Sequence, residues 1–321
     1  MRSPELVEGE EVDTAGFCTQ ARVLIVAGKG GVGKTTVAAT LAQMAADAGL
    51  RALIVEIEGK SGLGAAFGHA DALDYDEREL APGISARTVT PDFALVEYLE
   101  DHGLRRVSKR LAKSGALEVV SSAIPGIKDI LVLGKVKALA REDPADVIVV
   151  DAPAAGHAIT FLASARGLLD AVRVGPIVDQ AREVNDMLTN AEKCQVVLVT
   201  LPEETPVNEV VETAFALEDR VGIKLAPLVV NGVYPVLDLD VGAITGSGLD
   251  GRDAESLRAA AEFRLHRQEL QAAQVARLTG ALPLPQIVLP HLFTSALGPT
   301  ELTELARAMA EQVADLPTVT A

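Results

Sequence analysis

Short runs of β-branched and aliphatic residues recur along the chain, separated by longer alanine- and leucine-rich stretches. The runs lack the alternation of polar and apolar residues that marks a half-buried strand. Continuous apolar runs of this kind are typical of strands that are covered on both faces. The clearest runs are Val23–Ala27, Ala52–Ile57, Val147–Val150, Val196–Thr200, Leu228–Asn231 and Leu284–Leu289, with Ile84–Thr90 as a further candidate. Intervening segments such as Thr35–Ala48 have a helical composition. This pattern predicts an α/β fold with a doubly wound, mostly parallel sheet.

Two segments interrupt the alternation. Residues 92–143 have the pattern of consecutive helices broken at Pro125 and Gly126, and residues 232–280 begin with a Gly- and Asp-rich loop before a long helix from about Asp253 to Leu278. We expect both to be helical insertions on one face of the sheet, within a single domain over residues 21–321. Residues 1–20 are acidic and lack the apolar core of a signal peptide, so we expect a flexible tail there.

Charge and composition exclude several classes of function. The net charge is −16, whereas a nucleic-acid-binding protein needs a basic surface, and the densest basic stretch, residues 105–113, has the spacing of one solvated helix face. No apolar run approaches the roughly 18 residues that span a bilayer, so we expect a cytoplasmic protein without stable membrane insertion. The two cysteines, Cys18 and Cys194, are far apart in sequence and predict neither a disulfide framework nor a zinc site.

Residues 21–36, ARVLIVAGKGGVGKTT, combine an apolar strand, a glycine-rich turn and the start of a helix. The turn fits the dinucleotide fingerprint G-x-G-x-x-G and also the Walker A pattern G-x-x-x-x-G-K-[ST]. A dinucleotide site would not require Lys34 followed by Thr35, although Glu56 at the end of the next strand could bind a ribose. The ATP interpretation is therefore favoured, with the dinucleotide interpretation kept as the alternative.

The Walker A pattern assigns a role to each residue type. Glycines allow backbone N–H groups to surround a phosphate, and the following helix directs its positive N-terminus at the same group. Lys34 would bridge the β- and γ-phosphates of ATP, and the Thr35 hydroxyl would ligate Mg²⁺. The expected nucleotide-binding residues of the loop are Gly28, Gly30, Gly31, Val32, Gly33, Lys34, Thr35 and Thr36.

A second acidic strand end completes the expected metal site. The run VIVVDAPAAGH over residues 147–157 is an apolar strand ending in Asp151, which is a Walker B arrangement in which Asp151 would hold the Mg²⁺ shell. Glu56 and Glu58 lie at the carboxyl end of the predicted strand Ala52–Ile57, at the edge where ligands bind in such sheets. The alternative for these two glutamates is that they only cap a strand.

The segment GKGGVGKTT, with Lys29 inside the loop, resembles the deviant Walker A loop of septum-site ATPases, nitrogenase reductase, arsenite-pump ATPases and tail-anchored-protein-targeting ATPases. The likeness is nearest to actinobacterial arsenite-pump-like ATPases and extends over most of residues 21–315. It implies the fold of a P-loop NTPase that hydrolyses ATP with Mg²⁺. It also implies that Lys29 contacts phosphates in a partner subunit and thus acts as a catalytic residue together with Lys34, Glu58 and Asp151.

The same resemblance assigns further residues. Glu58 stands where the family carries an aspartate that positions the attacking water. The run at Asp151 resembles the family's second switch, D-T-A-P-T-G-H, in which Gly156 would sense the γ-phosphate. Asn231, at a strand end, resembles the adenine-reading asparagine, although an asparagine before a glycine is also common in turns. Pro290 resembles the residue that packs on the base.

The resemblance implies an ATP-driven dimeric switch, either a homodimer or a heterodimer with a paralogue, that handles a protein client through residues 92–143. The apolar residues of that segment could equally be helix core. Two alternatives remain: a biosynthetic enzyme that uses ATP on a small carboxylate, and a partition-type positioning ATPase, which the −16 charge disfavours. Arsenite binding and the dimer zinc site of targeting factors need cysteine clusters that this sequence lacks.

Overall fold

The computed structural model describes residues 13–57, 62–101, 103, 126–142, 144–244 and 250–316. Nine strands form one sheet in the order β3-β4-β2-β5-β1-β6-β8-β9, with β7 paired to β6. The strands are β1 Val23–Gly28, β2 Ala52–Ile57, β3 Arg78–Ala81, β4 Ile84–Val89, β5 Val147–Ala154, β6 Cys194–Thr200, β7 Lys224–Leu225, β8 Leu228–Val233 and β9 Gln286–Pro290. Every pairing is parallel except that of β3 with β4, so the prediction of a mostly parallel α/β sheet is confirmed.

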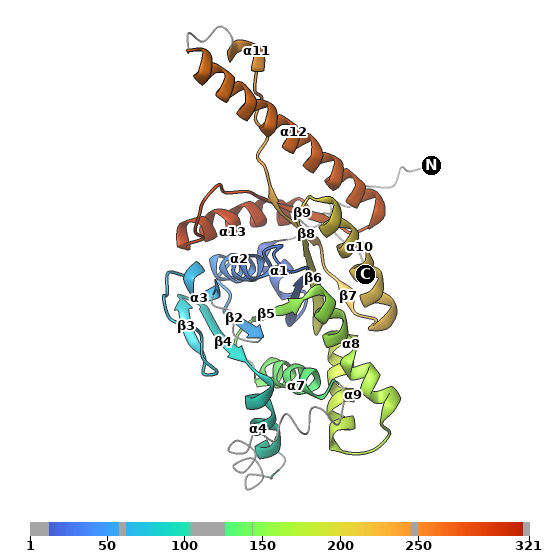
Figure 1. The fold of residues 1–321 in the computed structure, drawn as a ribbon. Helices are drawn as coiled ribbons and strands as arrows, with labels where there is room; N and C mark the ends of the chain where they lie inside the picture. Colours follow the sequence, from blue (N-terminus) through green and yellow to red (C-terminus); the bar gives the residue numbers. More distant parts are fainter. Residues whose placement is uncertain are drawn as a thin grey trace, which may run out of the picture.

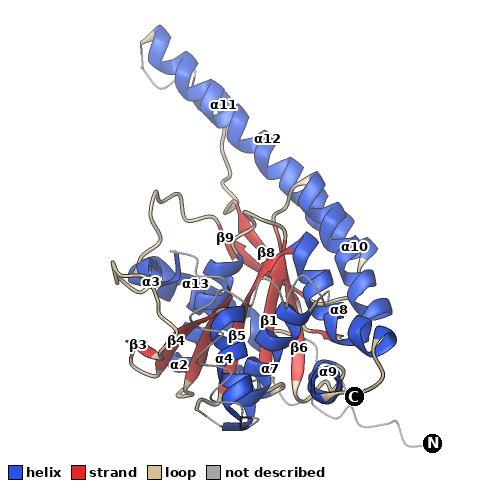
Figure 2. Cartoon of the chain, turned by 60° about the horizontal axis from the view of Figure 1, so that its bottom comes forward, coloured by secondary structure: helices blue, strands red, loops and turns tan. Residues whose placement is uncertain are grey.

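Helices cover both faces of the sheet (Figures 1 and 2). Alternate residues of β1 enter different cores: Val23 and Ile25 pack with α7, α8, α9 and α10, whereas Leu24 and Val26 pack with α1, α2, α3 and α13. This two-sided burial explains why the strands have continuous apolar sequences. The helices are α1 Thr14–Thr19, α2 Lys34–Asp47, α3 Gly62–Ala66, α4 Pro91–Asp101, α7 Ile127–Glu142, α8 Ala155–Ala171, α9 Pro176–Leu188, α10 Glu204–Arg220, α11 Val241–Ile244, α12 Gly251–Ala281 and α13 Pro299–Ala314.

The first predicted insertion contributes α4 and α7, and the basic stretch at 105–113 lies outside the described residues. Leu131, Leu133 and Val136 of α7 are buried against the sheet. The apolar residues of α7 therefore belong to the core rather than to an exposed surface. Leu278, near the end of α12, enters the same core, so the two helical segments share one face of the sheet.

Helix α12 projects beyond the rest of the molecule as a long arm (Figures 1 and 2). Its 31 residues correspond to roughly 46 Å at the α-helical rise. Asp250 caps its N-terminus by accepting hydrogen bonds from the backbone N–H groups of Arg252 and Asp253. Its buried residues are Ala261, Gln271 and Leu278, so most of its surface faces solvent.

The prediction of a flexible tail over residues 1–20 is wrong for residues 14–19, which form α1. Asp13 caps this helix by accepting a hydrogen bond from the backbone N–H of Gly16, and Phe17 and Cys18 are buried. Burial of Phe17 and Cys18 docks this short helix although the sequence before it is acidic. Contacts with α2 and α13 hold α1 against the sheet.

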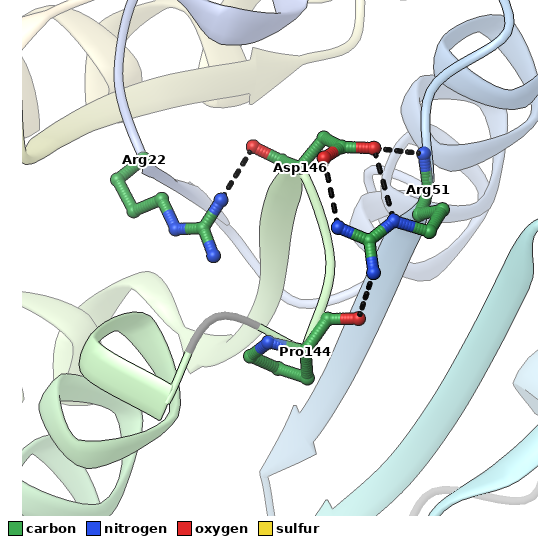
Figure 3. A network of polar contacts seen from close by, with 4 residues as sticks. All are labelled: Arg22, Arg51, Pro144 and Asp146. Atoms are coloured by element: carbon green, nitrogen blue, oxygen red, sulfur yellow. Dashed lines mark hydrogen bonds and ion pairs between the residues drawn. The ribbon is translucent and has the colours of Figure 1, made fainter.

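Opposite the carboxyl edge, a polar network joins the amino ends of β1, β2 and β5 (Figure 3). The Arg51 side chain donates to Asp146 through Nε and Nη2 at 3.3 and 3.0 Å, and its backbone N–H donates to the same carboxylate at 2.8 Å. Arg22 donates to the Asp146 backbone oxygen at 2.9 Å. These hydrogen bonds from Arg51 lower the pKa of Asp146. Within the described part of the chain, no helix combines the length and apolar character needed to cross a bilayer.

Candidate nucleotide site

The loop between β1 and α2 depends on glycine at two positions. A Cβ on Gly28 would lie 2.3 Å from the backbone oxygen of Val199, because β1 and β6 run side by side there. Gly33 has a φ of +91° and a Cβ there would lie 2.2 Å from Nδ2 of Asn231. Larger residues at either position would change the path of the loop.

Lys34, the first residue of α2, is buried, with 7% of its surface exposed. Its Nζ donates a hydrogen bond to the backbone oxygen of Lys29 at 3.0 Å. The ammonium group thus lies across the inside of the loop, as a phosphate-binding lysine requires. Gly30 and Gly31 are exposed, Val32 is buried, and Thr36 lies partly buried in the first turn of the helix.

Thr35 and Asp151, separated by 116 positions, meet at this edge of the sheet. The Thr35 hydroxyl donates to Oδ2 of Asp151 at 2.6 Å. Asp151 is fully buried in β5, in register with Val26 of β1 and Glu56 of β2. A hydroxyl and a carboxylate are ligands that Mg²⁺ accepts, so this pair fits a magnesium ion. Within the described ranges, no cluster of three or more His, Cys, Asp or Glu side chains is placed to hold a metal ion.

Glu56 is fully buried and accepts a hydrogen bond from the Thr88 hydroxyl at 3.0 Å. This hydrogen bond ties Glu56 of β2 to the residue in register with it on β4. Glu58 lies outside the described residues. Gly156 lies in the first turn of α8, directly after β5.

Asn231 connects β8 to the loop. Its Nδ2 donates to the backbone oxygen of Val32 at 2.9 Å, and it lies within the strand rather than in a turn. Pro290 ends the neighbouring strand β9 and pairs in register with Val233. The two residues predicted to contact the base, Asn231 and Pro290, therefore lie on the adjacent strands β8 and β9 of the structure.

Two features of this region were not predicted from the sequence. Lys29 forms an ion pair with Glu209 of α10, with Nζ and Oε1 2.6 Å apart. Beside Asn231 and Pro290, the ring of Tyr234 stacks on His291 at 5.0 Å, and the guanidinium of Arg264 lies 4.4 Å from the Tyr234 centroid. Both the ion pair and the ring stack join residues that are distant in sequence, and no local sequence motif marks either of them.

The two cysteines take no part in the site. Cys18 and Cys194 are buried free thiols in α1 and β6. Burial raises the pKa of Cys18 to about 12 and also raises that of Cys194. Both therefore stay protonated at neutral pH, which agrees with the expectation of two isolated thiols.

A parallel sheet with a glycine loop and a buried lysine after its central strand is the architecture of P-loop nucleotide hydrolases. Comparison with known proteins is more specific: residues 21–173 match the family model described as anion-transporting ATPase. Residues 21–173 are thus similar to an ATPase family, and together with relatives that are named as ATPases this identifies the protein as a nucleotide-binding ATPase.

Three relatives agree with this assignment. The chain is 29% identical to ATPase BagA of Mycobacterium tuberculosis, in an alignment that covers 95% of this chain and 97% of the relative. It is 28% identical to ATPase get3 of Schizosaccharomyces japonicus over 54% of this chain and 56% of that protein. It is 27% identical to the arsenical pump-driving ATPase of Escherichia coli over 66% of this chain and 39% of that protein.

Proposed function

We propose that the protein is an ATP-driven dimeric switch in which each subunit supplies Lys29 to the phosphates bound by its partner. The observation that carries this proposal is the contrast between the two lysines of the loop. Lys34 is buried across its own loop, whereas the Lys29 side chain is 39% exposed and bonds to a group outside the loop. A lysine in that position can reach a second subunit and stabilise charge there, as an arginine finger does.

Within one subunit, the residues divide the work between binding and charge stabilisation. Thr35 and Asp151 would hold Mg²⁺, and the loop N–H groups with Lys34 would bind the phosphates. Mg²⁺, when bound, neutralises charge on the transferring phosphoryl group. Glu58 would orient water and Gly156 would donate its N–H to the γ-phosphate.

The base would be read by Asn231 and covered by Pro290. A side-chain amide has two N–H donors and one acceptor oxygen. Asn231 uses one donor on Val32 in this structure. The second donor and the oxygen are enough for the edge of adenine, so the contact with the loop and the reading of the base are compatible.

The proposed client contacts the first helical segment. Between α4, α7 and α9 lies a cleft of about 900 Å³. Ion pairs cross it, including Lys135 with Glu97 at 2.8 Å, and Lys137 and Arg141 with Glu183. The described part of this segment therefore offers a charged surface, which favours a polar client segment over an apolar one.

The test of the dimeric switch is sedimentation velocity with Mg²⁺ and a non-hydrolysable ATP analogue, together with steady-state turnover. Wild-type protein should associate only with nucleotide. Lys29→Ala should bind nucleotide but stay monomeric, and its turnover should fall about a hundredfold to a thousandfold, the loss typical for removal of one charge-stabilising group. Lys34→Ala should lose nucleotide binding, and Lys193→Ala, which removes an exposed lysine remote from the loop, should behave as wild type. Normal association and turnover of Lys29→Ala would contradict the proposal.

The client is tested by affinity capture with Glu58→Gln as bait in ATP, compared with Lys34→Ala. Recovery of a protein by the ATP-competent bait and not by the other would support a nucleotide-gated client. Equal recovery by both baits would oppose it and favour the metabolite-using enzyme, which a screen for metabolite-dependent ATP turnover then tests.

A further inference from the structure

The Lys29 side chain is held by its own subunit. Its Nζ lies 2.6 Å from Oε1 of Glu209, and both side chains are a little under two-fifths exposed, at 39% and 38%. The Lys29 backbone oxygen also accepts the hydrogen bond from Lys34. Lys29 is thus fixed at both ends: the backbone by the loop and the ammonium group by α10.

Helix α10 is a firm support for this contact. Val207, Val210 and Leu217 are buried in the core on its face of the sheet. Glu209 lies one residue from Val210 but points away from the core toward the loop. A carboxylate on a helix fixed in this way holds a flexible lysine in one place.

We propose that Glu209 is a positioning residue for Lys29, which holds it on its own subunit until the phosphates of the partner subunit replace the carboxylate. The inference rests on the proposed role of Lys29 between subunits. One ammonium group cannot lie on Glu209 and deep in a neighbouring site together, so closure of the dimer breaks this ion pair in both subunits. Glu209 then sets how readily nucleotide-bound subunits associate.

The size of the effect follows from exposure. Ion pairs between partly exposed side chains are weak, and each closed dimer would lose two of them. Glu209→Gln, which keeps the shape and removes the charge, should therefore strengthen nucleotide-dependent association by about twofold to thirtyfold. Because the pair is partly exposed, added salt should reduce the difference between variant and wild type.

The experiment measures the dissociation constant of the dimer by sedimentation velocity, with Mg²⁺ and the ATP analogue, for wild type, Glu209→Gln and Glu209→Asp. Glu209→Gln should associate more tightly, and Glu209→Asp should return toward wild type because the charge is kept. Glu212→Gln is the matched control: it lies one turn further along α10, is exposed, and should leave association unchanged. In turnover assays, Glu209→Gln should reach half-maximal rate at a lower protein concentration with the rate at saturating protein unchanged.

A double-mutant cycle with Lys29→Ala separates this inference from a merely structural role. In binding of the ATP analogue to the single subunit, Glu209→Gln should have no effect in either background. If wild type associates with nucleotide and Glu209→Gln associates equally tightly or more weakly, the positioning role of Glu209 is overturned and the dimeric switch still holds. Wild type that remains monomeric with nucleotide would overturn the dimeric switch itself, and this inference with it.

Discussion

At the scale of single residues, Asp146 is the clearest source of pH-dependent stability. Hydrogen bonds from Arg51 lower its pKa, so its contribution is present above the unfolded-state value near 4 and is lost as the pH falls through the lower folded value. The carboxylate is 37% exposed, which limits the contribution to about 0.2–1 kcal/mol. Asp146→Asn should lower the free energy of unfolding by that amount at pH 7 and by less at pH 3, measured by urea denaturation. Asp219→Asn, at an exposed position of α10, should change neither value; an equal loss at both pH values for Asp146→Asn would contradict the role of its charge.

The sequence was most informative at the residues of the loop, because a phosphate cradle is local. Lys34 and Thr35 follow the glycines directly, and a strand ending in Asp151 is recognisable by itself. In the structure the side chains of Thr35 and Asp151 are in contact, and their role as Mg²⁺ ligands stays a prediction. The partners of Lys29 and Asn231 were not predictable in this way: Glu209 and Val32 reach them only through the packing of α10 and β8 against the loop.

At the scale of elements, the docking of α1 gives a prediction that separates burial from composition. Phe17 is 3% exposed, whereas Phe215 on α10 is 50% exposed. Phe17→Ala should lower the free energy of unfolding by about 3–5 kcal/mol, and Phe215→Ala should change it by less than about 0.5 kcal/mol. Chemical denaturation of both variants measures the difference. Similar small losses for both would show that α1 contributes little to the core.

Burial also explains which elements could be predicted. The seven apolar runs became strands because both of their faces are covered, which removes polar residues from the sequence. Strands β3 and β7 were missed because they have four and two residues and lie at less buried positions. Helix α1 was missed because its acidic surroundings suggested a tail, although Phe17 and Cys18 are buried.

At the scale of the whole molecule, the arm formed by α12 makes polar contacts with α10. Arg267 donates to Glu203 at 2.8 Å, and Arg277 donates to Asn208 at 2.5 Å, so α12 is tied to the beginning of α10. The hydrogen bond to Glu203 raises the pKa of Arg267, so its guanidinium group is charged at neutral pH. The length of α12 was predicted from the sequence, but its projection from the sheet was not. Helical periodicity predicts which residues share a face of the helix, but it does not predict whether another element packs against that face.

The hold of α10 on this arm can be measured by hydrogen exchange. The double variant Arg267→Ala/Arg277→Ala removes the contacts of these two side chains with α10. It leaves Gln271 and Leu278, the buried residues in the C-terminal half of α12, in place. We expect faster exchange of the amides of α12 and unchanged exchange in β1 and α2, because an arm with few buried residues opens locally without the sheet. Arg258→Ala is the matched control, since its partner Glu262 lies on the same helix, 4.0 Å away, and contributes nothing to the attachment. If the double variant exchanges like wild type, the buried residues alone hold the arm. If β1 exchanges faster as well, the arm and the sheet unfold as one unit, and α12 supports the nucleotide site directly.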